Sequence, residues 1–143
     1  MSVRIQAQVR APPAYYIGQF RAEMQRVLST WAAVARALGA AGHDLEITSW
    51  WRDFRPVGGA TYSQHLVGTA IDALSPRLTR AQLLPLVQRA ARLYGTSAPT
   101  KASERSGRSV HVQVLPVGTV ATLVRQGILA RAESFVGPPQ PLS

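Results

Sequence analysis

The chain contains no cysteine and no asparagine among its 143 residues, and its only lysine is Lys101. Without cysteine, disulfides, cysteine-based zinc sites and thiol nucleophiles are all excluded. No apolar run approaches the roughly 18 residues that a membrane-spanning helix requires. The first residues, Met1 to Gln6, lack the apolar core of a signal peptide. We therefore expect a protein made in the cytosol, without a membrane span or an export signal of its own.

Acidic residues are also scarce, because seven Asp and Glu face sixteen Lys and Arg and give a formal net charge of +9. One interpretation is a bias toward Arg, Ala, Gly and Pro, the residues that GC-rich codons encode. The other is an anionic partner, either nucleic acid or an acidic cell envelope. The basic residues are scattered and never adjacent, which favours the first interpretation. No nucleic-acid-binding motif accompanies the charge, so a nucleic-acid partner is the weakest hypothesis.

The length of the chain and its 46% hydrophobic content predict one domain with a single core. We place this domain at residues 1–136. The remaining residues, 137–143, form a Pro-rich tail that we expect to be disordered.

Three helices are predicted from the apolar pattern. Apolar residues recur every three or four positions over 20–38, which indicates one buried helical face. A second helix is predicted over 79–94, where the spacing of Thr79 and Gln82 is that of a capping box. A last helix is expected to begin near Thr119.

Three segments alternate apolar and polar residues and are predicted strands, at 45–50, 69–74 and 110–114. In the last of these the valines face one way, whereas His111 and Gln113 face the other. A long loop is expected over 96–108. The order helix, strand, strand, helix, strand, helix predicts an α+β fold with a small antiparallel sheet flanked by helices.

Two histidines and one aspartate are candidate metal ligands. His65 follows a Gly-rich loop, and His111 lies on the polar face of the last strand. Asp72 lies on a strand predicted to be apolar, where a carboxylate without a partner is costly. Two imidazoles and one carboxylate, with water in the fourth position, make a catalytic zinc site. From spacing alone, the alternative is that these are ordinary surface or hydrogen-bonded residues.

Three motifs resemble those of the zinc D-Ala-D-Ala carboxypeptidase family, which shares its fold with the Hedgehog amino-terminal domain. They are Ser-Trp-Trp-Arg at 49–52, the segment 63–72, and Val-His-Val at 110–112. The middle segment meets every fixed position of the family pattern Ser-x-His-x-x-Gly-x-Ala-x-Asp, namely Ser63, His65, Gly68, Ala70 and Asp72. The resemblance covers about residues 45–115 and implies a Hedgehog/DD-peptidase-like fold.

The resemblance implies that His65, Asp72 and His111 bind Zn²⁺. It also implies that Arg52 contacts the substrate carbonyl or the developing oxyanion. The alternative for Arg52 is a surface salt bridge, for example with Asp53.

The resemblance gives other motif residues substrate-binding or structural roles. Ser63 is expected either to bind substrate or to brace the metal-binding segment. Gly68 and Ala70 are expected to let the chain pass close to the metal. Trp50 is assigned to the peptide cleft, and strand alternation requires that one of Trp50 and Trp51 face the core.

The chain departs from the family at the general base, which the family carries as Glu or Asp three residues before the third ligand. Here that position is Arg108, which cannot accept a proton. We nominate Glu104, in the loop before the last strand, as the substitute base, and Asp53 as the second choice. The alternative for Glu104 is a solvated loop charge. Relatives often carry an acid or His at the position of Gln113, which can still hydrogen-bond to a metal ligand.

The resemblance therefore implies a zinc metallopeptidase that hydrolyses peptidoglycan stem peptides or cross-links. The resemblance suggests a phage endolysin-like enzyme that reaches the cell wall after lysis or on a phage particle. The positive charge would help it approach anionic wall polymers. The alternative, supported by Arg108, is a non-catalytic module of the same fold that retains the metal and binds the wall or serves as a phage structural part.

Overall fold

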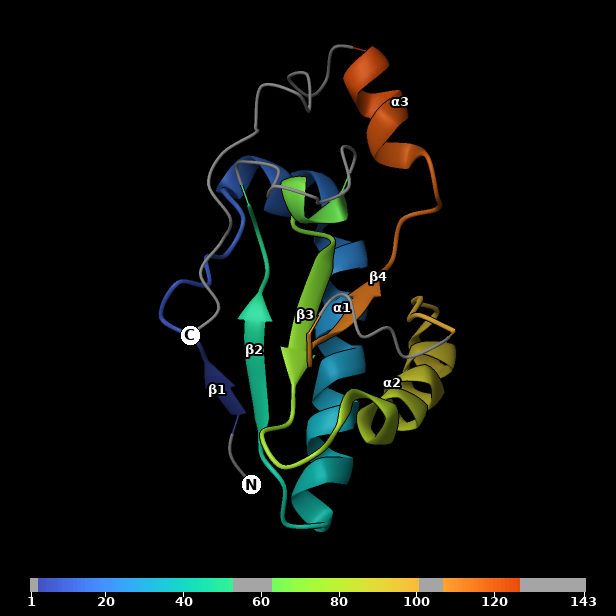
Figure 1. Cartoon of the computed structure of the whole chain (residues 1–143). Helices are drawn as coiled ribbons and strands as arrows, with labels where there is room; N and C mark the ends of the chain where they lie inside the picture. Colours follow the sequence, from blue (N-terminus) through green and yellow to red (C-terminus); the bar gives the residue numbers. More distant parts are fainter. Residues whose placement is uncertain (1–2, 53–62, 101–106, 127–143) are drawn as a thin grey trace.

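The computed structural model describes residues 3–52, 63–100 and 107–126. In chain order these form β1 (Val3–Ile5), α1 (Ala14–Ala40), β2 (Leu45–Ser49), the 3-10 turn η1 (Gln64–Leu66), β3 (Ala70–Leu74), α2 (Arg80–Tyr94), β4 (Val110–Gln113) and α3 (Thr119–Arg125). The fold class is α+β, as predicted (Figure 1). The tail at 137–143 lies outside the described residues, and the domain boundary at 136 stays a prediction.

The strands form one four-stranded sheet in the order β1-β2-β3-β4. β2 and β4 each pair antiparallel with β3, as predicted, whereas β1 pairs parallel with β2. The sheet is therefore mixed, and the prediction of an antiparallel sheet was wrong at this edge. The cause lies in β1, which has only three residues, all of them exposed. Val3, Arg4 and Ile5 do alternate apolar and polar residues, but a run of three is shorter than the four to eight residues that indicate a strand.

α1 is a 27-residue amphipathic helix whose buried face is the predicted one. It begins at Ala14, before the predicted start at Phe20. Pro13 is its N-cap, and the Pro13 carbonyl accepts hydrogen bonds from the Tyr16 and Ile17 N–H groups. Phe20 has a non-helical backbone (φ −126°, ψ 31°), so the helix bends where the apolar pattern begins. Among the described residues, no helix combines the length and the apolar character needed to cross a membrane.

α2 begins and ends as its sequence predicts. The Thr79 side chain accepts from the Gln82 backbone N–H, and the Gln82 side chain accepts from the Thr79 N–H, which completes the capping box. At the other end Gly95 adopts a left-handed conformation with φ +66°. Arg26 of α1 donates hydrogen bonds to the carbonyls of Tyr94 and Gly95, which fixes the end of α2 against α1.

Alternation along the strands gives the sheet two different faces. The face toward the two long helices, of which α1 passes behind the sheet in Figure 1, is apolar. Its core side chains are Leu45, Ile71, Ala73, Val110 and Val112. Because successive strand residues point to opposite faces, Asp72 and His111 lie on the other face, which we call the site face.

Candidate metal centre

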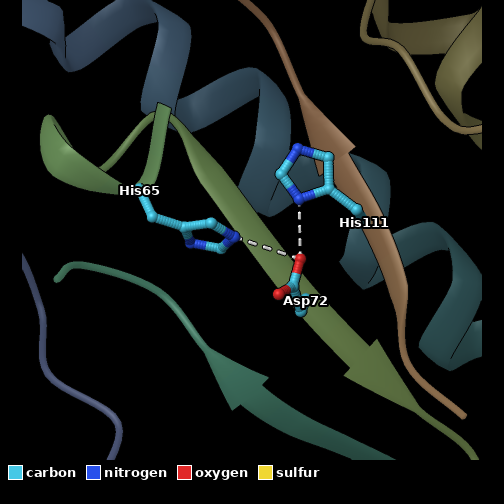
Figure 2. Close-up of side chains that lie close together, drawn as sticks. All are labelled: His65, Asp72 and His111. Atoms are coloured by element: carbon cyan, nitrogen blue, oxygen red, sulfur yellow. Dashed lines mark hydrogen bonds and ion pairs between the residues drawn. The ribbon is translucent and has the colours of Figure 1, made fainter. Parts of the chain in front are cut away.

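The three predicted metal ligands come together in the structure. His65 comes from η1, Asp72 from β3 and His111 from β4, and all three point to one place (Figure 2). Each offers one ligand atom, and these atoms all lie within 4.8 Å of one another. The group can therefore hold a metal ion. That this ion is zinc stays a prediction.

The sheet itself positions two of these ligands. Asp72 and His111 are direct partners in the β3–β4 register, so their side chains project side by side on the site face. The Nδ1 atom of His111 lies 2.8 Å from Asp72 Oδ1. Strand pairing alone therefore sets the spacing of these two groups.

His65 is placed by the turn that η1 makes before β3. Ser63 caps this turn, because its Oγ accepts a hydrogen bond of 3.2 Å from the His65 backbone N–H. This matches the second role considered for Ser63, that of bracing the metal-binding segment. The His65 side chain is 3% exposed, and its Nε2 lies 3.2 Å from Asp72 Oδ1.

Hydrogen bonds on the far side of each ring determine which nitrogen faces Asp72 without a proton. His65 Nδ1 lies 2.6 Å from the Trp50 carbonyl oxygen, which can only accept, so Nδ1 carries the proton and donates. His111 Nε2 likewise donates to Gln113 Oε1 at 2.9 Å. The neutral form of each ring therefore presents a lone pair to Asp72 Oδ1. Lone pairs converging on a carboxylate oxygen repel unless a proton or a metal ion lies among them, so the donor set is compatible with a metal ion.

The electrostatics of His65 and Asp72 agree with this assignment, whereas those of His111 favour its protonated form. Burial lowers the pKa of His65, although the charge of Asp72 opposes this shift. Burial would raise the pKa of the Asp72 carboxyl, but the charges and hydrogen bonds of the two histidines outweigh it and hold that pKa far below its usual range. Burial also acts to lower the pKa of His111, yet the hydrogen bond and charge of Asp72 raise it. Asp72 is thus an ionised carboxylate that lies between a neutral His65 and a His111 whose protonated form is favoured.

Arg52 contacts the other oxygen of Asp72. Its Nη2 lies 3.5 Å from Asp72 Oδ2, and its Nε donates to Ser49 Oγ at 3.1 Å. The Arg52 backbone N–H donates to the His65 carbonyl at 3.0 Å, which ties the end of β2 to η1. Because Arg52 holds Oδ2, Asp72 presents the single oxygen Oδ1 to both imidazoles. The alternative partner Asp53 lies outside the described residues.

Both tryptophans of the 49–52 motif bind the chain that follows His65. Trp50 packs against the main core, and its indole N–H donates to the Gly68 carbonyl at 2.7 Å. The Trp51 indole donates to the Leu66 carbonyl at 3.1 Å. Trp50 is the core-facing member of the pair, and its role in binding substrate stays a prediction.

A buried glutamine that the sequence analysis did not single out joins the two histidine-bearing segments. Gln64 is 6% exposed and precedes His65. Its Oε1 accepts from Thr69 Oγ1 and from the backbone N–H groups of Val114 and Leu115, and its Nε2 donates to the Leu115 carbonyl. The Gln64 amide thus links η1 to the chain just after β4. Only its place beside His65 in the motif could have pointed to it.

Gly68 is structural, as predicted, but for a different reason. Its φ is +79°, a region that side-chain-bearing residues rarely adopt. A Cβ atom built at Gly68 would collide with the ring of Pro12 and lie 3.2 Å from Met24 Cε. Close packing against the start of α1, and not closeness to the metal group, requires glycine here. Ala70, the other small residue of the motif, is fully buried at the start of β3.

Arg108, at the position where the family carries its general base, points to backbone outside the metal group. Its Nη2 donates to the carbonyls of Pro76 at 2.7 Å, Leu78 at 2.8 Å and Ser75 at 3.3 Å. The side chain therefore secures the loop between β3 and α2. Glu104, the nominated base, lies outside the described residues and stays a prediction.

Comparisons of the chain with protein-family models, with curated proteins and with solved structures found no match. The case for a function therefore rests on the motif residues and on the geometry of His65, Asp72 and His111.

Proposed function

We propose that the chain is a zinc-dependent peptidase of the D-Ala-D-Ala carboxypeptidase kind, with a Hedgehog/DD-peptidase-like fold, that hydrolyses peptidoglycan stem peptides or cross-links. The observation that carries the proposal is the convergence of His65, Asp72 and His111, whose ligand atoms lie within 4.8 Å of one another. Nitrogen and oxygen donors of this kind suit Zn²⁺. The two-histidine, one-carboxylate set also matches catalytic zinc sites, which keep a further position for water or substrate.

Each residue of the proposed site has a distinct role in holding the metal, orienting its ligands or accepting a proton. His65, Asp72 and His111 hold the ion, which supplies Lewis-acid activation of water and of the scissile carbonyl. Trp50 and Gln113 fix the histidine rings by accepting their outer N–H groups. Arg52, whose side chain is 14% exposed, keeps Asp72 oriented and places a permanent positive charge beside the site, where an oxyanion develops. Glu104 is the proposed proton acceptor.

A peptidase of this kind would act at the cell wall, after lysis or on a phage particle, as phage endolysins do. The formal charge of +9 supports attraction to anionic wall polymers, and this attraction weakens as salt rises.

The second candidate is a non-catalytic module that retains the metal and binds wall peptides or forms part of a phage particle. Arg108 favours it, because the position of the usual base carries a cation that is bound to three backbone carbonyls.

The loss of turbidity of a purified peptidoglycan suspension distinguishes the two candidates. We expect wild-type protein to clear the suspension, a chelator to stop clearing, and added zinc to restore it. His65→Ala should not clear, whereas the control His43→Ala should clear normally, because His43 lies outside the metal group. A zinc-loaded wild-type protein that leaves the suspension turbid, and whose peptides stay intact by mass spectrometry, would support the binding module instead.

A further inference from the structure

The outer edge of β4, on the side away from β3, carries backbone groups of the metal ligand His111. Ser97 and Gln113 exchange two hydrogen bonds, Ser97 N–H to Gln113 O at 2.7 Å and Gln113 N–H to Ser97 O at 3.0 Å. In an antiparallel ladder, every second residue directs its N–H and C=O to the same side. Because Gln113 directs these groups away from β3, His111 directs its own backbone N–H and C=O to that outer edge as well.

Neighbouring groups are paired on both sides of His111 along this edge. Ser97 pairs with Gln113, and the Arg80 guanidinium donates to the Ser109 carbonyl. Within residues 3–52, 63–100 and 107–126, the His111 backbone N–H and C=O have no hydrogen-bond partner. The edge therefore offers one donor and one acceptor between two positions that are already paired.

Proline explains why the segment after Ser97 does not continue the pairing. Continuing the antiparallel register from Ser97 and Gln113 would bring Pro99 opposite His111. Pro99 has no N–H to donate to the His111 carbonyl. Its own carbonyl accepts a hydrogen bond of 2.8 Å from Gln88 of α2, which draws the segment toward the helix.

We propose that an extended peptide, the substrate of the proposed peptidase, docks on this edge by pairing one of its residues with the His111 N–H and C=O. This inference rests on the proposed function. A peptide backbone fits, because it carries an acceptor and a donor at the spacing that a strand edge recognises. The same residue supplies a metal ligand from its side chain, which is 35% exposed, so docking brings a peptide bond to the metal centre.

Amide hydrogen exchange measured by NMR on the zinc-loaded full chain tests the docking edge. The probe is diacetyl-L-Lys-D-Ala-D-Ala in molar excess. Without the probe, the His111 N–H should exchange much faster than the N–H groups of Val110 and Val112, which face β3. With the probe, exchange at His111 should slow by about tenfold, the protection that one added hydrogen bond gives. The His111 carbonyl carbon should shift together with its amide.

The opposite edge of the sheet provides a matched control. Gln6 N–H donates to the Ile47 carbonyl at 3.1 Å, so the adjacent Ile5 N–H faces away from β2 on the outer edge of β1. β1 and β4 form opposite edges of the sheet (Figure 1). Exchange at Ile5 should not respond to the probe.

The outcomes separate this inference from the proposed function. Clearing of peptidoglycan without any change at His111 would overturn the docking edge and leave the peptidase standing. Protection at His111 without clearing or cleavage would support the docking edge on a protein that is not an enzyme. A His111 N–H that exchanges as slowly as that of Val112 before any probe is added would also overturn the proposal.

Discussion

Asp72 and His111 face each other across β3 and β4, with 2.8 Å between Asp72 Oδ1 and His111 Nδ1. The other nitrogen of the same ring donates to Gln113, so the nitrogen that meets Asp72 is the one left to bind a metal. His65 reaches the same oxygen at 3.2 Å with its own outer nitrogen bound to a backbone carbonyl. Two rings from different elements are thus fixed in the form that a metal requires, and the predictions below follow from this arrangement.

Replacing Gln113 should weaken metal binding without unfolding the chain. Gln113→Leu removes the acceptor of the His111 Nε2–H, and we expect zinc affinity to fall by about 10–100-fold, as is typical when a metal-ligating histidine loses its outer partner. Gln113→Glu keeps an acceptor and should retain affinity within a few-fold. Titration against a competing chelator measures both. Equal affinities for the leucine and glutamate variants would show that Gln113 does not position His111.

Two glycines with the same φ angle allow the stability cost of backbone strain to be measured apart from the cost of a steric clash. Gly68 and Gly42 both have φ +79°, but a Cβ atom meets the Pro12 ring only at Gly68. Gly42→Ala should lower the free energy of unfolding by about 1–2 kcal/mol, the cost of a left-handed alanine. Gly68→Ala should cost about 1–3 kcal/mol more, because the added methyl must displace packed atoms. Urea denaturation measures the difference, and similar losses in both variants would contradict the role given to Pro12.

Arg52 should matter more for turnover than for folding. Arg52→Ala removes the positive charge beside Asp72, and we expect peptidoglycan hydrolysis to fall by about 10²-fold or more. The melting temperature should fall only by the loss of the hydrogen bonds to Ser49 and Asp72, so the loss of turnover should far exceed the loss of stability. Arg108→Ala is the control, because Arg108 binds the carbonyls of the loop before α2 and should affect stability while sparing turnover. If stability and turnover fall together in Arg52→Ala, Arg52 has a structural role.

Glu104 is expected to accept the proton from water. Glu104→Gln should cut hydrolysis by about 10²-fold, within the range of a lost general base, while the zinc content stays the same. Glu23→Gln in α1 is the matched control and should have full activity. Full activity in Glu104→Gln would shift the role to Asp53 or to the metal alone.

The fold class and the long helices could be predicted from local patterns, whereas the three candidate ligands were predicted from the family resemblance of their motifs. The periodicity of α1 and the capping box of Thr79 and Gln82 act within a few residues. β1 was missed, because its alternation of apolar and polar residues spans only Val3, Arg4 and Ile5, too few to indicate a strand. Its parallel pairing depends on β2, far along the chain.

The groups that orient the ligands depend on contacts distant in sequence. Gln64 binds the backbone at Leu115, 51 positions away, and nothing near Gln64 indicates that contact. The same holds for Arg108, whose long side chain reaches carbonyls more than 30 positions earlier in the sequence. Sequence spacing could place Arg108 three residues before His111, but not determine where its guanidinium points.

The zinc content of the purified chain, measured by elemental analysis after dialysis against metal-free buffer, tests the central claim most directly. Loaded wild-type protein should retain about one zinc ion per chain, as expected for two imidazoles and a carboxylate that converge on one point. His65→Ala and Asp72→Ala should lose it, and His43→Ala should retain it. Wild-type protein that retains no zinc, or His65→Ala and Asp72→Ala variants that retain as much as the wild type, would contradict the metal centre.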